Sequence, residues 1–171
     1  MAALSVARIN QYLSGAFGGR ARTALNALFT DMATTPVSIA VATFTVLPEH
    51  ANRILTLNRA AGIAILLPPA TGTGAKFDFY VGTTFTGNCT IDTVGTDVMQ
   101  GLAVFNADST GDVTYTFPTT SSTDTLTMYT ASSNTTGGIV GAQVQLRDVA
   151  PGVYSVLYFS EAGGTEATPF S

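Results

Sequence analysis

Apolar and polar side chains alternate along most of the chain from Val37 onward, and this period of two limits the possible folds more than any other feature. Successive side chains of a β-strand point to opposite faces, so the alternation predicts strands with one buried face. Clusters of Gly, Pro, Asn and Asp, which favour turns, separate the expected strands. These strands cover residues 37–46, 53–57, 63–67, 77–81, 89–93, 102–105, 113–117, 126–128, 142–146 and 153–159.

Two strands carry further information. The phase of the alternation shifts between Val41 and Phe44, which predicts a β-bulge near Ala42-Thr43. Val153–Phe159 is apolar on both faces, as expected of a strand covered from both sides. There is no strand–helix–strand rhythm and no internal repeat of fixed period, which argues against a solenoid or a propeller. We therefore expect an all-β protein, an antiparallel β-sandwich or short barrel-like domain with an N-terminal helical arm.

The expected arm precedes the alternating region. Residues 4–10 and 23–32 have helical character, and the apolar side chains of the second stretch recur at i, i+3, i+4 and i+7, which marks one face of a helix. A short terminal helix gains most of its stability by packing against something else. We predict an arm over residues 1–36 and a β-sandwich-like domain over residues 37–171 with a short C-terminal tail.

Charge is scarce and unevenly distributed. Only 11% of the 171 residues are charged and the net charge is −4. Residues 1–30 carry +3 and the rest of the chain carries −7, which predicts a basic arm that docks on an acidic partner; three solvated arginines on one helix are the alternative. The candidate partner-binding residues are Arg8, Arg20, Arg22, Leu25, Leu28, Phe29 and Met32.

The composition also argues against several classes of protein. An acidic chain is not expected to bind nucleic acid directly. No run of about 18 apolar residues is present, so we expect no membrane span, and the first ten residues do not resemble a secretory signal. Low charge suits a surface that neighbouring subunits cover, because interface cores are depleted of charged residues.

The reactive side chains do not form a recognisable catalytic set. His50 is the sole histidine and lies in an expected turn, and no G-x-S-x-G motif accompanies it. Cys89 is the sole cysteine, so no intrachain disulfide can form, and its phase with Ile91 predicts a small buried apolar residue. One Cys and one His cannot complete a zinc site. We expect no enzymatic activity, no cofactor and no metal.

Three weaker patterns have structural explanations. Gly72–Lys76 has the wrong spacing for a phosphate-binding loop, and we interpret it as a hairpin connection. Asn106, Asp108 and Asp112 cluster like a fragment of a calcium loop but do not fit its frame; ordinary turn-forming residues explain them, and a weak ion site is the alternative. Three aspartates could converge as glycosidase carboxylates, although nothing in the sequence singles them out: Asp78, Asp92 and Asp97.

Three stretches of sequence resemble small structural proteins of tailed bacteriophages. The first runs from Leu66 to Phe77 and continues through Tyr80–Thr84; the second covers residues 135–156, with Arg147-Asp148-Val149-Ala150-Pro151-Gly152 at its centre; the third is the ending Gly164–Ser171. The resemblance covers about residues 53–171, and the arm has no counterpart. The family is that of head decoration, or capsid cement, proteins.

This resemblance implies a structural virion protein, made in the host cytoplasm, that binds the capsid exterior and stabilises the shell. Its partners would be the major capsid protein and further copies of itself, with a trimer favoured and a dimer possible. The alternative is a tail-fibre, baseplate or head-fibre component that binds a host receptor, which would gather aromatic side chains on exposed loops. A small β-fold hydrolase and a bacterial surface adhesion module are further alternatives.

Overall fold

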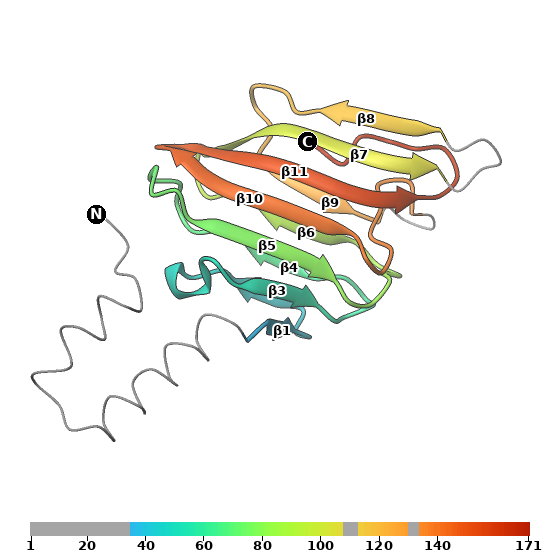
Figure 1. The fold of residues 1–171 in the computed structure, drawn as a ribbon, viewed down its shortest axis with the longest axis horizontal. Helices are drawn as coiled ribbons and strands as arrows, with labels where there is room; N and C mark the ends of the chain where they lie inside the picture. Colours follow the sequence, from blue (N-terminus) through green and yellow to red (C-terminus); the bar gives the residue numbers. More distant parts are fainter. Residues whose placement is uncertain (1–34, 108–112, 130–133) are drawn as a thin grey trace, which may run out of the picture. The chain divides into compact units, whose positions relative to one another are not determined.

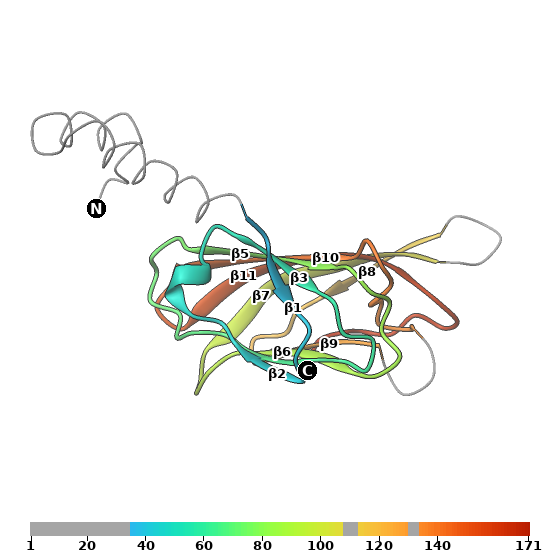
Figure 2. The same ribbon diagram turned by 90° about the horizontal axis from the view of Figure 1, so that it is seen from below.

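Residues 35–107, 113–129 and 134–171 are described by the computed structural model, and from Pro36 onward they form a sandwich of two β-sheets (Figures 1 and 2). The predicted all-β, sandwich-like class is confirmed. The predicted arm, residues 1–36, lies outside the described residues except for its last two positions.

One sheet has seven strands and the other has four. The order in the seven-stranded sheet is β1 (Val37–Ile39), β3 (Ile54–Leu57), β5 (Lys76–Val81), β10 (Gln143–Ala150), β11 (Val153–Ala162), β7 (Val98–Ala107) and β8 (Thr114–Pro118). The order in the four-stranded sheet is β2 (Thr43–Thr45), β4 (Ala64–Leu66), β6 (Cys89–Asp92) and β9 (Thr125–Met128). A short 3₁₀ helix, η1 (Pro48–His50), lies between β2 and β3.

The prediction of antiparallel pairing is wrong for about half of the neighbouring strands, because both sheets are mixed. The pairs β1–β3, β3–β5, β2–β4, β4–β6 and β7–β11 are parallel. The first six strands alternate between the two sheets, so the chain returns to each sheet in the direction in which it left. A parallel crossover often contains a helix. Among these six strands each crossover is instead a strand of the opposite sheet, and the β7–β11 connection runs through β8, β9 and β10, so the sequence shows no helical rhythm.

The same alternation explains two further corrections. The predicted bulge near Ala42-Thr43 is the point where the chain leaves β1 in one sheet and enters β2 in the other. The predicted hairpin connection at Gly72–Lys76 joins β4 of the four-stranded sheet to β5 of the seven-stranded sheet. Segments that connect one sheet to the other and tight turns within a hairpin are both rich in Gly and Pro, so composition does not distinguish the two kinds of connection.

The core fills the space between the sheets. Its largest fully buried side chains are aromatic, and Phe105 packs edge-to-face on Tyr158 with ring centroids 5.2 Å apart. The Tyr158 hydroxyl donates a hydrogen bond to the carbonyl oxygen of Thr136 at 3.0 Å, which satisfies its polar atom in the core. Cys89 is fully buried, as its alternation with Ile91 predicted.

β9 is the last strand of the four-stranded sheet, and its outer edge is covered by the residues that follow β11. The backbone N–H of Thr127 donates to the carbonyl of Pro169 at 2.7 Å, and that of Ser171 donates to Thr125 at 3.1 Å. Between them Phe170 inserts its ring, which is 8% exposed. The residues after β11 therefore extend the four-stranded sheet, and the edge at β8 has no such cover within the described residues.

Candidate interaction surface

The solvent-facing side of the seven-stranded sheet, which we call the outer face, carries an unusual number of large apolar side chains. Phe159 is 43% exposed and Ile54 is 50% exposed. A single exposed apolar residue is normal, but a group of them on one face marks an interaction site. The group consists of five exposed residues, Ile54, Tyr80, Leu102, Val149 and Phe159, and the half-buried Val104 and Leu157.

The strand register places several of these side chains side by side. Leu157 of β11 lies opposite Leu102 of β7, and one row further along Phe159 lies opposite Val104. On the other side of β11, Leu157 and Phe159 are flanked by glutamines of β10. Shallow hollows open between these rows, one of them beside Phe159 and Glu161. The centre of the outer face thus combines apolar side chains with uncharged glutamines, and interface cores are likewise depleted of charge.

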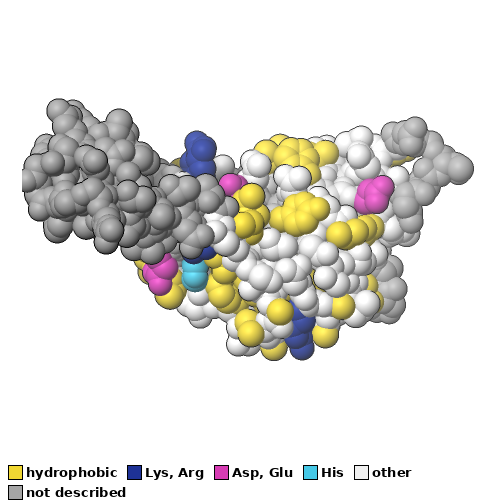
Figure 3. Space-filling view, turned by 60° about the horizontal axis from the view of Figure 1, so that its bottom comes forward, with side chains coloured by type: hydrophobic (Ala, Val, Ile, Leu, Met, Phe, Trp, Pro, Cys, Tyr) yellow, Lys and Arg dark blue, Asp and Glu magenta, His cyan; other side chains and the backbone are white. Residues whose placement is uncertain are grey.

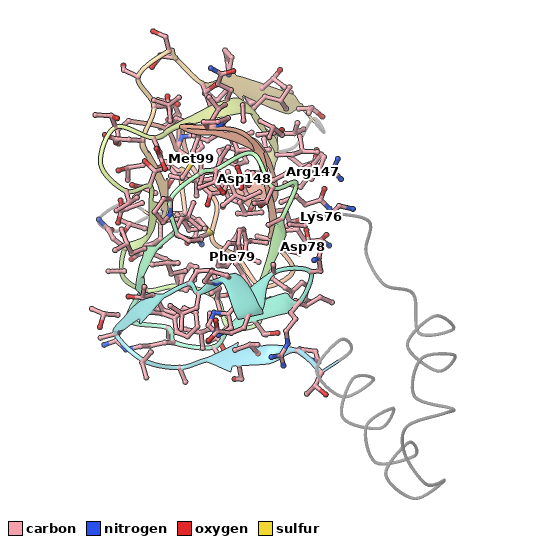
Figure 4. All side chains as sticks on the ribbon, turned by 90° about the vertical axis from the view of Figure 1, so that its left-hand side faces the viewer. Lys76, Asp78, Phe79, Met99, Arg147 and Asp148 are labelled. Atoms are coloured by element: carbon pink, nitrogen blue, oxygen red, sulfur yellow. The ribbon has the colours of Figure 1, made fainter. Side chains whose placement is uncertain are left out.

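Most charged side chains of the outer face lie toward its ends; Asp78, opposite Gln145 of β10, is the exception. Lys76 of β5 and Arg147 of β10 are directly opposite each other, and Glu161 lies near the far end of β11. Figure 4 shows Lys76, Asp78 and Arg147 pointing out of the sheet, whereas Phe79, Met99 and Asp148 point into the sandwich. Like charges directly opposite each other repel. Asp78, two residues from Lys76 on the same face, offsets part of this positive charge, and the remainder favours an acidic group on whatever covers the pair.

The surface view agrees with this arrangement. Figure 3 shows the outer face obliquely in its upper half, where hydrophobic side chains stand among uncharged polar ones and few side chains are charged.

One strand of this surface, β11, departs from its predicted environment. We expected Val153–Phe159 to be covered on both faces because it is apolar on both. Tyr154, Val156 and Tyr158 are buried in the core, but Phe159 is exposed on the outer face. The strand is apolar on both faces, as the sequence indicates, but the prediction that both faces are covered is wrong. No described element of the chain covers the second face.

Asp148 is the one buried charged residue of the described chain, and the sequence did not single it out. Its carboxylate accepts hydrogen bonds from the backbone N–H groups of Gly72 and Thr73 at 2.6 and 2.9 Å and from the Thr73 hydroxyl at 2.7 Å. The Thr71 hydroxyl makes a longer contact of 3.4 Å. Because these donors occupy the carboxylate, it fixes the loop before β5.

The reactive residues are dispersed. Nδ1 of His50 accepts a hydrogen bond from the backbone N–H of Leu47 at 2.9 Å, and its ring packs against Phe44. Burial, followed by the charge of Asp92, raises the pKa of the Cys89 thiol to about 12, although a backbone hydrogen bond from Ile63 opposes the shift. His50 and Cys89 are therefore engaged separately, one in a turn and the other in the core.

The three aspartates considered as glycosidase carboxylates have separate surroundings. Asp78 lies on the outer face. The carboxylate of Asp92 in β6 accepts hydrogen bonds from the hydroxyls of Thr90 and Thr125, both at 2.9 Å. Asp97 accepts one from the backbone N–H of Ala70 at 2.7 Å. The described residues bring no three His, Cys, Asp or Glu side chains together in a metal-binding group; Asp108 and Asp112 lie outside them.

The candidate partner-binding residues of the arm, from Arg8 to Met32, all lie outside the described residues. In the part of the chain that is described, no helix has the length and apolar character needed to cross a membrane. The described chain is thus a two-sheet β-sandwich whose seven-stranded sheet exposes apolar side chains on its outer face. No family model, no curated protein and no solved structure matches the chain.

Proposed function

We propose that the protein is a structural virion component that binds the outer surface of a bacteriophage capsid and stabilises the shell, as decoration proteins do. The outer face of the seven-stranded sheet is the docking surface in this proposal. The observation that carries it is the exposed apolar group around Leu157 and Phe159, which a chain active on its own in solution would not be expected to maintain.

The resemblance of the sequence to capsid cement proteins supports the same function. Arg147 and Val149, which lie on the outer face, belong to the stretch over residues 135–156 that carries part of this resemblance. The basic pair Lys76–Arg147 would contact acidic groups of the capsid subunits at one end of the face. If the protein binds as an oligomer, each oligomer repeats this contact, so a modest affinity per site is sufficient to hold it on the shell.

Co-sedimentation with expanded shells assembled from the major capsid protein of the encoding phage tests this proposal. The variant Leu102→Glu/Phe159→Glu places two carboxylates in the apolar centre, and we expect it to weaken binding at least about tenfold, the equivalent of about 1.4 kcal/mol. The matched control is Leu66→Glu, which changes an exposed leucine of β4 in the other sheet and should bind normally.

Both variants alter exposed side chains, so circular dichroism and melting temperature should stay close to those of the unmodified protein. Equal binding by the double variant and the control would remove the outer face from the mechanism. Failure of the unmodified chain to bind shells at all, together with turnover of a small substrate, would contradict the proposed function itself.

A further inference from the structure

No described residue pairs with the edge of the seven-stranded sheet at β8. Within the described residues β8 pairs only with β7, and Figure 1 shows it as the last strand of that sheet. The strands at the other uncovered edges, β1 and β2, have three residues each, whereas β8 has five. It carries no charged side chain, although proteins commonly place charges on an edge strand to prevent pairing.

The backbone groups available at this edge follow from the ladder with β7. Val113 accepts a hydrogen bond from the backbone N–H of Ala107 at 3.0 Å. In an antiparallel pair this bonding repeats at every second residue, so the odd-numbered residues of β8 turn their N–H and C=O groups toward β7. Thr114 and Thr116 therefore turn theirs away from the sheet, toward the open edge.

The side chains of β8 are also incompletely covered. Tyr115 lies opposite Phe105 and so faces the side of the sheet on which the core lies, yet it is 40% exposed. Val113 is 45% exposed. Phe117, on the same side, packs against Phe105 with ring centroids 5.5 Å apart and is only partly buried.

We propose that β8 pairs with β8 of a second copy of this chain, antiparallel about a twofold axis at Tyr115, so that two seven-stranded sheets become one continuous sheet. In this register Thr114 lies opposite Thr116 of the second copy, and the outward N–H and C=O groups of both residues are satisfied. Pro118 has no N–H, so the pairing ends before it.

The register also covers the exposed side chains. Tyr115 meets Tyr115 of the second copy as a non-hydrogen-bonded pair, in which cross-strand side chains approach most closely. Val113 lies beside Phe117 of the second copy. The occupant is a second copy because the strand is self-complementary: its open groups, its exposed side chains and its lack of charge all match under a twofold rotation.

This inference does not depend on capsid binding, because two chains can pair through β8 whether or not they dock on a shell. A twofold edge contact produces dimers, whereas the resemblance to cement proteins led us to favour a trimer. The two proposals use different surfaces, the outer face and the edge, and so they can fail separately.

Disulfide trapping in the full-length protein tests the register. A non-hydrogen-bonded pair brings Cα atoms to about 4.5 Å, within the range of about 4.4–6.8 Å that a disulfide spans, so Tyr115→Cys should crosslink into dimers on oxidation. Thr116→Cys is the matched control: it lies opposite Thr114, so the two introduced thiols are offset and should crosslink poorly. Cys89 is buried and does not compete.

Sedimentation velocity tests the pairing without a crosslink. Thr116→Pro removes an N–H that bonds nothing in β7, and we expect at least a tenfold rise in the dimer dissociation constant with the fold retained. Thr116→Val keeps the N–H and the branched side chain and should remain a dimer. A monomeric unmodified chain at about 100 µM, or equal crosslinking of Tyr115→Cys and Thr116→Cys, would overturn the proposal.

Discussion

The carboxylate of Asp148 accepts hydrogen bonds from both the backbone N–H and the hydroxyl of Thr73, at 2.9 and 2.7 Å. These bonds join β10 to the loop that leads from one sheet into the other. Burial alone would raise the pKa of Asp148, but the hydrogen bonds from Thr73, Gly72 and Thr71 outweigh it and hold that pKa below its ordinary value.

A carboxyl group whose pKa is lower in the folded state stabilises the fold above its unfolded pKa of about 3.9. This stabilisation is lost as the pH falls from about 4 through the folded-state value. We expect the free energy of unfolding to decrease over this acidic range, as measured by urea titration at a series of pH values. Asp148→Asn should flatten that part of the profile, and an unchanged slope would show that other carboxylates dominate it.

At neutral pH the same substitution should be costly. Asp148→Asn replaces one acceptor oxygen by an amide NH₂ group, which would face the backbone donors that the carboxylate now satisfies. We expect a loss of about 3 kcal/mol of unfolding free energy. Asp78→Asn, on the exposed outer face, should change it by less than about 0.5 kcal/mol and serves as the control.

The Cys89 thiol should be nearly inert in the folded protein. Raising its pKa from 9.0 to about 12 lowers the thiolate fraction about a thousandfold. Reaction with a chromogenic disulfide at about pH 8 should therefore be very slow until guanidinium unfolds the chain. Rapid labelling of the native protein would contradict the burial of this residue.

Phe170 should contribute to stability although it lies next to the end of the chain. Its buried ring and the backbone bonds around it cover the edge of β9. We expect Phe170→Ala to cost about 3 kcal/mol in unfolding free energy, as for a core phenylalanine. Phe159→Ala removes an exposed ring and should cost much less. Similar losses for the two variants would mean that the C-terminal segment does not pack as described.

The N-terminal arm carries a separate prediction. If Arg8, Arg20 and Arg22 pair with acidic groups on a capsid subunit or on another copy of the chain, deletion of residues 1–33 should weaken co-sedimentation with expanded shells, and raised salt should reproduce part of the loss. Replacing the three arginines with alanine measures how much their charge contributes to binding, apart from the contribution of the rest of the arm. Unchanged binding and unchanged oligomer size after the deletion would exclude the arm from assembly.

Local pattern predicted the strands better than it predicted their neighbours. The alternation around Cys89 and along β5 and β10 correctly indicated which side chains are buried. It could not indicate that β1 and β2 belong to different sheets. An alternation with a period of two shows which side chains share a face of a strand, but it does not show which strand lies beside it. Pairings such as Val37 with Leu55 depend on long-range contacts.

The sequence could not predict the exposed apolar outer face, for a related reason. Phe159 and Leu157 look like core residues in the sequence, because apolar character does not distinguish a face buried within the chain from one reserved for a partner. Asp148 was overlooked because its role depends on Thr73, which is far away in the sequence and close only after folding.

The passage of the first six strands back and forth between the sheets has a kinetic consequence. Neither sheet can be completed while the other is missing, since each crossover among these six strands is itself a strand of the opposite sheet. Such an interleaved topology rests on contacts between distant parts of the chain, and these are slow to form because long loops must close first. Folding of the sandwich should therefore be slow and all-or-none, with no half-built layer able to persist alone.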